Sequence, residues 1–468
     1  MAEDYDAADF DKAQEIIDAG EREARVHLPA FKALANQLNQ FPAPPRKPAL
    51  TYPDSLYIKE VNTSNIDKDL AQLVRRSLNI KGHQKQELRA IEQGINYAFG
   101  TQFFTNVNYA LSSDSIGATV HIEAENVAPA IMNFGLHYSN AEDAAIILKA
   151  NLRNAIGHAS IISGGLRISQ SPALTANYKQ YFGYNRRFLY KLGMTFQKVN
   201  QNTFIQNGDL IRPYNRRQLE GLGQLLWMPQ HNFLFGLGYK WNSYELEPRS
   251  DELLNFEKFN SSNRAVELFY NWNTLDKNYF PRRGMEVSFG TSWHHGLSYE
   301  MDFNAPEAVN FLNIATPDSY TRAHLFLSNY ASLNASLVFF QHFGVGISTE
   351  PVLFDNFLLG GDFFNRQQSL PFVGLKEYEA PFSNVANLQL GLRFNLSSKL
   401  LLTLKGNVAS GNYAEAAVFD DFGDNAIVGG GLSIGYDSFL GPINFTLGRN
   451  SWNNEWQYAI NMGHRFSF

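Results

Sequence analysis

The chain has 468 residues, of which 44% are hydrophobic and 14% aromatic, and it contains no cysteine. Its formal charge of −6 gives no indication of nucleic-acid binding, and the absence of cysteine excludes disulfides and thiolate metal sites. No uninterrupted apolar run reaches the roughly 18 residues that a membrane helix requires. Strands that alternate apolar and polar residues pass this filter, so a membrane barrel remains admissible.

The N-terminal region predicts helices followed by a linker. The first residues lack the basic region and apolar core of a secretory signal, so for an outer-membrane protein we expect further sequence upstream of Met1. Residues 9–37 have apolar residues at helical spacing, and we expect Gly20 and Pro29 to divide them into two helices. The Pro-rich stretch 41–49 predicts a stiff, extended linker.

Residues 50–127 predict a small α+β domain of the order β-α-α-β-β. The expected elements are a strand at 55–66, helices at 67–78 and 84–99, and strands at 103–111 and 118–125.

Residues 128–468 predict strands without helices, in segments of about ten residues that suit tilted membrane strands. The sixteen segments are 129–140, 143–157, 159–170, 172–184, 188–201, 215–228, 232–243, 263–276, 284–296, 319–333, 335–350, 384–397, 399–411, 425–437, 441–451 and 455–468. An even number is typical of single-chain bacterial barrels. The alternative is a soluble β-sandwich or propeller with the same alternation.

The alternation assigns the two faces of the wall. Within 387–396, leucines and a phenylalanine alternate with polar residues that include Arg393, and within 232–242 aromatic residues alternate with a set that includes Lys240. We expect the apolar face to meet lipid, because an Arg or Lys at the bilayer midplane destabilises a barrel by about 2 to 4 kcal/mol.

The last segment, 455–468, alternates from Trp456 onward and ends the printed chain on Phe468. We expect it to close the barrel against segment 129–140, whose Met132, Phe134, Leu136 and Tyr138 then point outward.

This organisation resembles the Omp85 superfamily, in which periplasmic POTRA domains precede a 16-stranded barrel. Residues 100–111, GTQFFTNVNYAL, resemble the entry to a POTRA strand. Residues 273–284, NTLDKNYFPRRG, resemble the turn between strands 8 and 9 of the family and include Asp276, Pro281 and Gly284. The resemblance implies a C-terminal assembly signal, which is carried here by Tyr458, Gly463, Phe466 and Phe468.

The resemblance also implies that the insert at 351–383 folds back into the lumen. This insert keeps an entry at Gly360 and Gly361, but it has Pro371, Phe372 and Gly374 where the family has an Arg-Gly-aromatic tip. Arg366 is the candidate for the family's lumen-anchoring arginine, and the alternative for it is a solvated loop charge.

Residues 1–40 resemble the closing helix of bacterial patatin-like phospholipase domains, which in some Bacteroidetes-type proteins precede one POTRA domain and an Omp85-like barrel; the alternative is an arbitrary amphipathic helix. A patatin-like hydrolase needs a G-x-S-x-G elbow and a later Asp-Gly pair. The motif Gly431, Ser433, Gly435 sits in an alternating strand, and no Asp-Gly dipeptide occurs. We therefore expect no catalytic residue in this chain, while the resemblance implies that the full-length parent is a patatin-like lipid acyl hydrolase.

His294 and His295 are adjacent on a predicted strand and cannot converge on one ion without a turn. We interpret them as residues of a loop tip and expect no metal and no cofactor.

The sequence thus predicts a bacterial outer-membrane barrel, with its POTRA-like domain in the periplasm, that anchors, displays or translocates an N-terminal patatin-like passenger in the manner of a type V secretion system. The alternative is an Omp85-type assembly or insertion factor, and the lumen loop disfavours a passive channel. The expected partners are outer-membrane lipid, the barrel assembly machinery and the passenger. Nucleic acid is not expected as a partner, and a homodimer is an alternative to a monomer.

Overall fold

The computed structural model describes residues 13–40, 54–63, 66, 68–78, 80, 82–101, 103–140, 143–157, 159–183, 186–204, 210–248, 256–303, 317–350, 352, 355–361, 369–413, 426–439 and 441–463. The predicted linker at 41–49 lies outside these residues.

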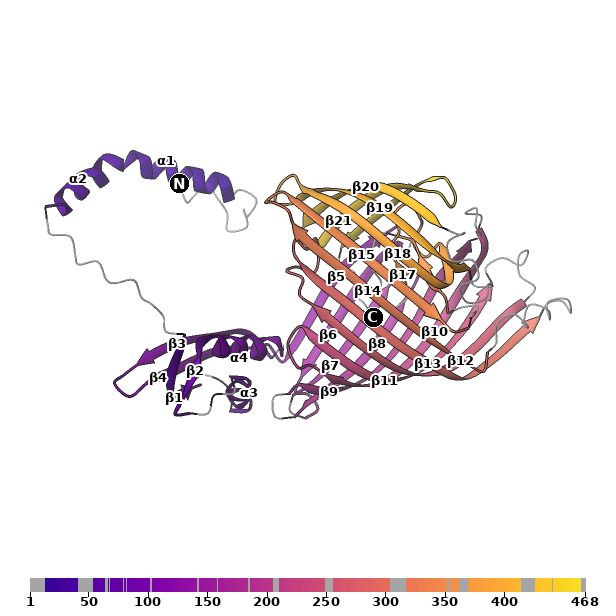
Figure 1. Cartoon of the computed structure of the whole chain (residues 1–468), viewed down its shortest axis with the longest axis horizontal. Helices are drawn as coiled ribbons and strands as arrows, with labels where there is room; N and C mark the ends of the chain where they lie inside the picture. The colour runs from indigo at the N-terminus through magenta and orange to yellow at the C-terminus, as the bar shows by residue number, and fades with distance from the viewer. Residues whose placement is uncertain are drawn as a thin grey trace. The chain divides into compact units, whose positions relative to one another are not determined.

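Two helices form the described part of the N-terminal unit: α1 (Ala13–Val26) and α2 (Leu28–Leu38) (Figure 1). The predicted break at Pro29 is close to the observed one, because this proline occupies the first turn of α2, where its missing N–H needs no partner. The predicted break at Gly20 is wrong, since α1 continues through it. One glycine in a helix costs only about 1 kcal/mol.

The α+β domain has a four-stranded sheet with two helices. Its elements are β1 (Ser55–Asn62), α3 (Lys68–Leu78), β2 (Gln84–Glu87), α4 (Leu88–Gly100), β3 (Phe104–Ser113) and β4 (Ala118–Asn126). The strand order is β2-β1-β4-β3, with β1 parallel to β4 and β3 antiparallel to it. Leu73, Val74 and Leu78 of α3 are buried, as are Ile91 of α4 and Ile58 and Val120 of the sheet.

This domain differs from the prediction at the start of its second helix. Residues 84–87, predicted as helix, form the short edge strand β2, so the order is β-α-β-α-β-β. Their sequence, QKQE, contains no apolar residue. The pattern of apolar residues therefore cannot distinguish a helix from a strand in this stretch. Its conformation is set by the pairing of β2 with β1.

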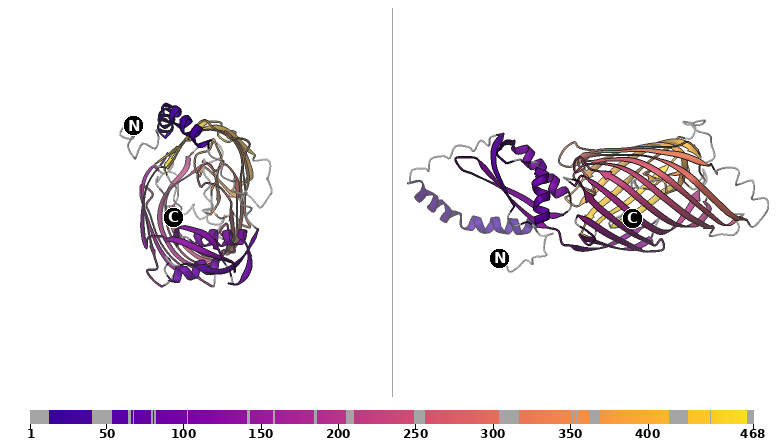
Figure 2. Two further views of the ribbon diagram at one scale, coloured as in Figure 1. Left: turned by 90° about the vertical axis from the view of Figure 1, so that its left-hand side faces the viewer. Right: turned by 90° about the horizontal axis from the view of Figure 1, so that it is seen from below.

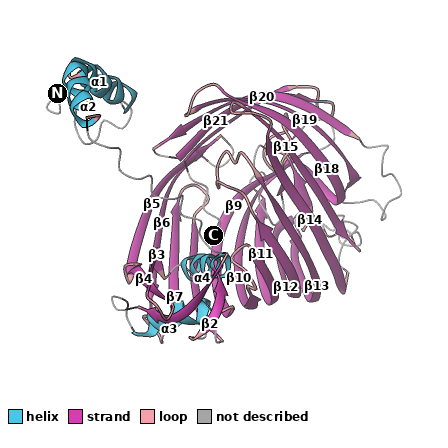
Figure 3. Ribbon diagram, turned by 60° about the vertical axis from the view of Figure 1, so that its left-hand side comes forward, coloured by secondary structure: helices cyan, strands magenta, loops and turns pink. Residues whose placement is uncertain are grey.

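Sixteen strands form the wall of a closed antiparallel barrel, and Figures 2 and 3 show the ring that they make. They are β5 (Ala130–Ser139), β6 (Asp143–Arg153), β7 (Ser160–Ile168), β8 (Ala173–Phe182), β9 (Phe188–Phe204), β10 (Leu210–Trp227), β11 (Phe233–Pro248), β12 (Phe256–Asn273), β13 (Gly284–Phe303), β14 (Ser319–Ser332), β15 (Leu337–Ser348), β18 (Ala380–Asn395), β19 (Leu400–Tyr413), β20 (Ile427–Ser438), β21 (Gly441–Asn450) and β22 (Trp456–Gly463). The predicted barrel and its strand number are confirmed. Two short strands, β16 (Phe357–Leu359) and β17 (Ser369–Leu370), belong to the segment between β15 and β18.

The two faces of the wall follow the predicted alternation. Met132 and Phe134 of β5 are 77% and 64% exposed, and the leucines 388 and 390 of β18 are exposed as well. The intervening Gln389 and Arg393 are 1% and 4% exposed and face the lumen. The barrel therefore turns its apolar side chains outward, the reverse of a soluble β-sandwich or propeller with a buried apolar core.

Strands β10 to β13 extend well beyond the predicted segments, with 18, 16, 18 and 20 residues. In the extension of β11, Glu245 and Glu247 pair with exposed Arg217 of β10 at 2.7 Å and 3.2 Å, while Tyr244 and Leu246 are buried on the lumen side. The outward face of β11 is therefore no longer apolar there, which explains why the sequence pattern stops before the strand does.

Among the described residues, no helix combines the length and the apolar character needed to cross a bilayer.

Candidate functional site: a loop docked inside the barrel

The segment between β15 and β18, residues 349–379, is called the lumen loop below. The predicted insert, 351–383, overlaps it and ends inside β18. Through β16 the loop pairs antiparallel with the start of β18, where Phe357 faces Phe382, and β16 also pairs with β17. The loop is thus attached to the wall by backbone hydrogen bonds at its base.

Gly360 and Gly361 form the predicted entry of the lumen loop. Their φ angles are +137° and +78°, a region that favours glycine. A Cβ on Gly360 would lie 2.0 Å from the carbonyl oxygen of Lys376, so the returning segment of the loop passes directly beside Gly360. Glycine is therefore required at Gly360 by both conformation and space.

The tip of the loop, Pro371 to Leu375, is buried against the lumen face of β18 to β21. Phe372 is 0% and Val373 2% exposed. Both belong to or adjoin an apolar cluster whose buried members are Phe326, Phe357, Leu359, Leu370, Phe372, Leu375, Ala380, Phe382, Val385, Ala409, Ile427 and Trp452. This cluster gives one side of the lumen a packed apolar core that a polar, water-filled lumen would lack.

Three asparagines of the wall hold the backbone of the tip. The Nδ2 amide of Asn387 donates to the carbonyl of Pro371 at 2.8 Å. The Nδ2 of Asn407 donates to the carbonyl of Val373 at 3.2 Å, and that of Asn450 to the carbonyl of Gly374 at 2.5 Å. These residues come from β18, β19 and β21, so neutral hydrogen bonds tie the tip to three strands.

Glycines in the wall make room for this tip. A Cβ on Gly429 of β20 would lie 2.6 Å from Cε1 of Phe372, and one on Gly448 of β21 would lie 2.8 Å from the nitrogen of Gly374. Gly374 itself has φ +93° and would bring a Cβ to 2.7 Å from the backbone of Arg449. The predicted loop residues Pro371, Phe372 and Gly374 are thus all placed at this contact.

At the entry of the loop, Asp355 binds the wall. Its Oδ1 accepts from Nη1 of Arg322 on β14 at 2.5 Å, and its Oδ2 accepts from the hydroxyl of Tyr320 at 2.6 Å. The guanidinium of Arg322 also lies over the ring of Phe357 at 4.2 Å. The wall supplies the cation and the loop the anion, the opposite of the pairing that the family resemblance implies. Arg366, the predicted loop cation, lies outside the described residues.

The predicted turn motif connects β12 and β13 and also contacts the lumen wall. Oδ1 of Asp276 accepts from the backbone N–H of Arg282 at 2.9 Å, and Gly284 has φ +106° with no room for a Cβ beside Thr274. Nη2 of the buried Arg393 donates to the carbonyls of Phe280 and Pro281. Asp276, Pro281 and Gly284 therefore shape a turn that Arg393 of β18 holds.

The predicted C-terminal signal is described in part. Tyr458 is 59% exposed on β22, and Phe466 and Phe468 lie outside the described residues. Gly463 is the last described residue of the closing seam, a name that we give to the three described Cα pairs Asn461–Ser139, Met462–Tyr138 and Gly463–His137. Gly463 has φ +88°, and a Cβ there would lie 1.9 Å from the carbonyl oxygen of Leu136.

Asn140 extends this seam beyond its backbone pairs. Its Nδ2 donates to the carbonyl of Tyr458 at 3.0 Å, and its Oδ1 accepts from the N–H of Ile460 at 3.1 Å. Its backbone N–H also donates to the carbonyl of Ile460 at 3.2 Å, so Asn140 adds three hydrogen bonds to the described part of the junction.

The two motifs set aside in the sequence lie inside strands. Ser433 is 1% exposed in β20 and hydrogen-bonds Oγ1 of Thr446 at 2.7 Å, so its G-x-S-x-G motif is part of a strand and not a nucleophile elbow.

The interpretation of His294 and His295 as loop-tip residues is wrong, because both lie within β13. His294 is buried and stacks on Tyr320, whereas His295 stacks on Trp293, so the two rings lie on opposite faces. Among the described residues, no group of three potential metal ligands occurs.

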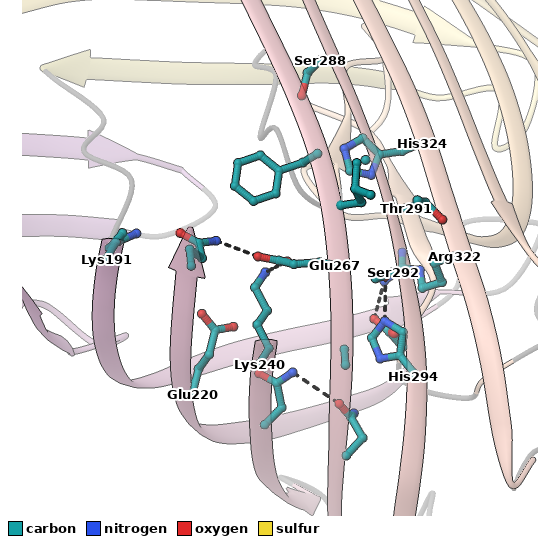
Figure 4. A pocket seen from close by; sticks show the side chains of 18 of the residues that line it. Lys191, Glu220, Lys240, Glu267, Ser288, Thr291, Ser292, His294, Arg322 and His324 are labelled. Carbon is teal, nitrogen blue, oxygen red and sulfur yellow. Dashed lines mark hydrogen bonds and ion pairs between the residues drawn. The ribbon is translucent and has the colours of Figure 1, made fainter. Parts of the chain in front are cut away.

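A cavity of about 440 Å³ occupies the other side of the lumen, along β8 to β14 (Figure 4). Its wall carries paired charges: Nζ of Lys240 lies 2.8 Å from Glu267, whose other oxygen accepts from Gln224 at 2.6 Å. The loop entry, Arg322 with Asp355, forms one end of its lining. Sequence analysis placed Lys240 on the polar face of the wall, but it did not predict a site formed by these residues or by the three asparagines, since each one has the pattern of an ordinary polar residue on a lumen face.

Comparisons with known proteins agree with this architecture. Residues 154–367 match the model of the Omp85 superfamily domain. BamA from Haemophilus ducreyi lacking POTRA domains 1–3 is similar with a TM-score of 0.59 and 15% identity, over 87% of this chain and 84% of that one. CdiB from Acinetobacter baumannii gives 0.54 and 10%, over 87% and 73%, and CdiB from Escherichia coli 0.53 and 13%, over 86% and 76%.

No curated protein sequence matches the chain. At identities of 10 to 15% the structural similarity establishes the fold, and the family model adds the domain assignment. Residues 154–367 are therefore similar to the Omp85 superfamily domain, within a chain whose barrel has the same fold as BamA and CdiB.

Proposed function

We propose that the chain is an outer-membrane barrel that anchors, displays or translocates an N-terminal patatin-like passenger and has no catalytic residue of its own. The outward apolar face of a closed barrel supports the membrane location, because that face has no partner within the barrel. The α+β domain then corresponds to a POTRA domain on the periplasmic side.

The observation that carries the passenger is the bare apolar face of α2. Leu28, Phe31, Leu34 and Leu38 follow helical spacing and are 43%, 56%, 52% and 58% exposed. An amphipathic helix of this length gains its stability by burying such a face. A folded domain that precedes α1 in the parent protein would cover it, which agrees with the resemblance of residues 1–40 to the end of a patatin-like domain.

The lumen loop supports anchoring over passive transport. Its tip is held by three asparagine side chains and an apolar cluster, so any passage along the lumen requires these contacts to open. A barrel that stays closed around a docked loop can still hold a domain tethered through α1 and α2.

A second candidate is an assembly or insertion factor for other outer-membrane proteins, in which the seam between β22 and β5 would open. Among the described residues, this seam consists of three Cα pairs, a backbone hydrogen bond from Asn140 to the carbonyl of Ile460, and the side-chain hydrogen bonds of Asn140. Opening of the seam would expose strand edges to a substrate strand.

A disulfide across the seam distinguishes the two functions. The chain has no cysteine, so Tyr138→Cys with Met462→Cys, which are Cα partners, would give one defined cross-link. For an anchor, we expect cells that rely on the locked protein to keep normal levels of other outer-membrane proteins. Loss of those proteins on oxidation and recovery on reduction would instead establish the insertion factor.

The passenger is tested by the full-length gene and by its product. We expect the upstream sequence to contain a G-x-S-x-G motif with a later Asp-Gly pair, and an N-terminal epitope to co-fractionate with a heat-modifiable barrel in the outer membrane. An upstream region without this motif pair would contradict the patatin-like passenger. A chain whose migration in detergent did not change on boiling would contradict the membrane barrel.

A further inference from the structure

The cavity beside β8 to β14 contains more positive than negative charge, although the whole chain is acidic with a net charge of −6. Five cationic side chains line it, against three carboxylates, which leaves an excess of two positive charges with histidine neutral. The cations are Lys179, Lys191, Arg216, Lys240 and Arg322, and the carboxylates are Glu220, Glu267 and Asp355.

Two of the three carboxylates are already engaged. Glu267 pairs with Lys240 at 2.8 Å, and Asp355 pairs with Arg322 at 2.5 Å. Of the lining charges, Glu220 alone remains to balance Lys179, Lys191 and Arg216, and within the described residues none of these four forms an ion pair. The excess charge is therefore concentrated on one part of the wall.

Lys179 and Lys191 are direct Cα partners on the antiparallel strands β8 and β9, and both line the cavity. Like charges placed directly opposite on one face of a sheet are destabilising. Figure 4 places Lys191 and Glu220 on one side of the cavity and His294, Arg322 and His324 on the other. The arrangement thus keeps a repulsive pair facing a cavity of the lumen, where a bound anion could relieve the repulsion.

Unused hydrogen-bond donors point to the chemistry of that ligand. Arg322 is 8% exposed, and its Nε and Nη2 are buried without a hydrogen-bond acceptor, as is Nε of Arg216. Guanidinium groups bind oxyanions through paired N–H donors, and phosphate supplies several acceptors at one centre. A buried donor without an acceptor is unfavourable by about 1 to 3 kcal/mol, which such a ligand would remove.

We propose that this cavity is a binding site for a small phosphate-bearing anion, held by Lys179 and Lys191 on one side and by Arg216 and Arg322 on the other. The volume of about 440 Å³ accommodates a phosphate group with a small organic substituent and does not require a polymer. The side chains face the lumen, so the ligand is a soluble phosphate and not a lipid headgroup. The proposal does not depend on the passenger.

Calorimetric titration of the purified full-length protein in detergent with inorganic phosphate and with glycerol phosphate tests the site. We expect saturable binding that persists at about 0.5 M chloride, because a partly buried site is screened less than a surface patch. Lys179→Gln with Lys191→Gln should weaken binding by about tenfold or more, as expected when charge-assisted hydrogen bonds are lost. Lys405→Gln removes the same charge from the lumen face of β19, outside the cavity, and should leave the affinity unchanged.

Heat-modifiable migration establishes that each variant is folded. The proposal is overturned if the folded wild-type protein shows no saturable binding of either phosphate. It is also overturned if Lys405→Gln weakens binding as much as the double variant does, since the effect would then be general lumen electrostatics. Binding of an acidic peptide in the absence of phosphate binding would replace the small anion by a polypeptide ligand.

Discussion

The two sides of the lumen satisfy their polar groups in different ways. On the side of β18 to β21, asparagine amides bind the carbonyls of the lumen loop, and glycines leave room for its apolar tip. On the side of β8 to β13, lysines, arginines and carboxylates line a cavity and remain partly unpaired. Neutral hydrogen bonds with close packing hold a segment in place, whereas excess charge in an open space prepares a site for a ligand.

One reporter makes this comparison measurable. Val373→Cys places a single thiol at the buried loop tip of a chain that otherwise lacks cysteine. The rate at which a maleimide labels this thiol in the folded protein reports how often the tip leaves the wall.

The largest effect is expected at the pair that joins the two sides, Arg322 and Asp355. Their side chains are 10% and 11% exposed, so removing one partner leaves a buried charge. Arg322→Gln should destabilise the docked loop by about 3 to 5 kcal/mol and raise the labelling rate of the reporter by more than a hundredfold. Replacing both partners by leucine should recover part of the loss. Unchanged labelling in Arg322→Gln would show that this pair does not hold the loop.

A smaller effect is expected from filling the space for the tip. Gly429→Ala places a methyl group 2.6 Å from Cε1 of Phe372, and overpacking of this kind costs about 1 to 3 kcal/mol. The labelling rate should rise by about tenfold or more. Gly406→Ala is the matched control, because a Cβ there meets no atom within 4 Å. Equal rates in the two variants would contradict the docking of the tip on β20.

Loss of one asparagine side chain should weaken the docking of the loop tip by less than overpacking does. Asn387→Ala leaves the carbonyl of Pro371 without its side-chain donor, which costs about 1 kcal/mol and should raise the labelling rate by about fivefold. Asn395→Ala serves as the control, because Asn395 is the last residue of the same strand and lies eight residues after Asn387. If neutral hydrogen bonds hold the tip, the rate in the wild type should change little between low and high salt.

The smallest effect is expected at an exposed ion pair, which provides the contrast to Arg322 and Asp355. Asp114 pairs with Lys59 at 3.0 Å and accepts from the N–H groups of Ile116 and Gly117, and these contacts lower the pKa of its carboxyl to about 2. A depressed pKa stabilises the folded state above the unfolded pKa of about 4, and this contribution is lost as the pH falls toward 2.

Asp114→Asn should therefore speed hydrogen exchange in the β3–β4 hairpin slightly at pH 7, and the difference from the wild type should shrink as the pH approaches 2. The lumen reporter should not respond to this variant. A difference that grows on acidification would show that the sign of this contribution is wrong.

The wall of the barrel was predictable from the sequence because every lipid-exposed strand must alternate, and the lumen insert at 351–383 stands out where alternation stops. The docking contacts were not predictable in the same way. Asn387 and Asn407 differ in no local respect from other lumen-facing polar residues, and only the register of β18 and β19 brings them to one loop.

The glycines illustrate the same limit. Gly431 and Gly435 read as a hydrolase motif with Ser433, whereas in the structure Gly429, Gly431 and Gly448 give the loop tip its space. The pairing of Arg322 with Asp355 depends on how the loop enters the barrel, which no spacing in the sequence encodes. The end of β11 was missed because its outward face carries Glu245 and Glu247 there, so the outward apolar periodicity stops before the strand does.

The most direct test of the account compares two single-cysteine variants in the folded protein. Val373→Cys lies at the docked tip, and Gln218→Cys lines the cavity on the opposite side of the lumen. The account predicts rapid maleimide labelling of Gln218→Cys and much slower labelling of Val373→Cys in the folded protein. Similar labelling rates for the two thiols in the folded protein would contradict it, because the loop would then not be docked.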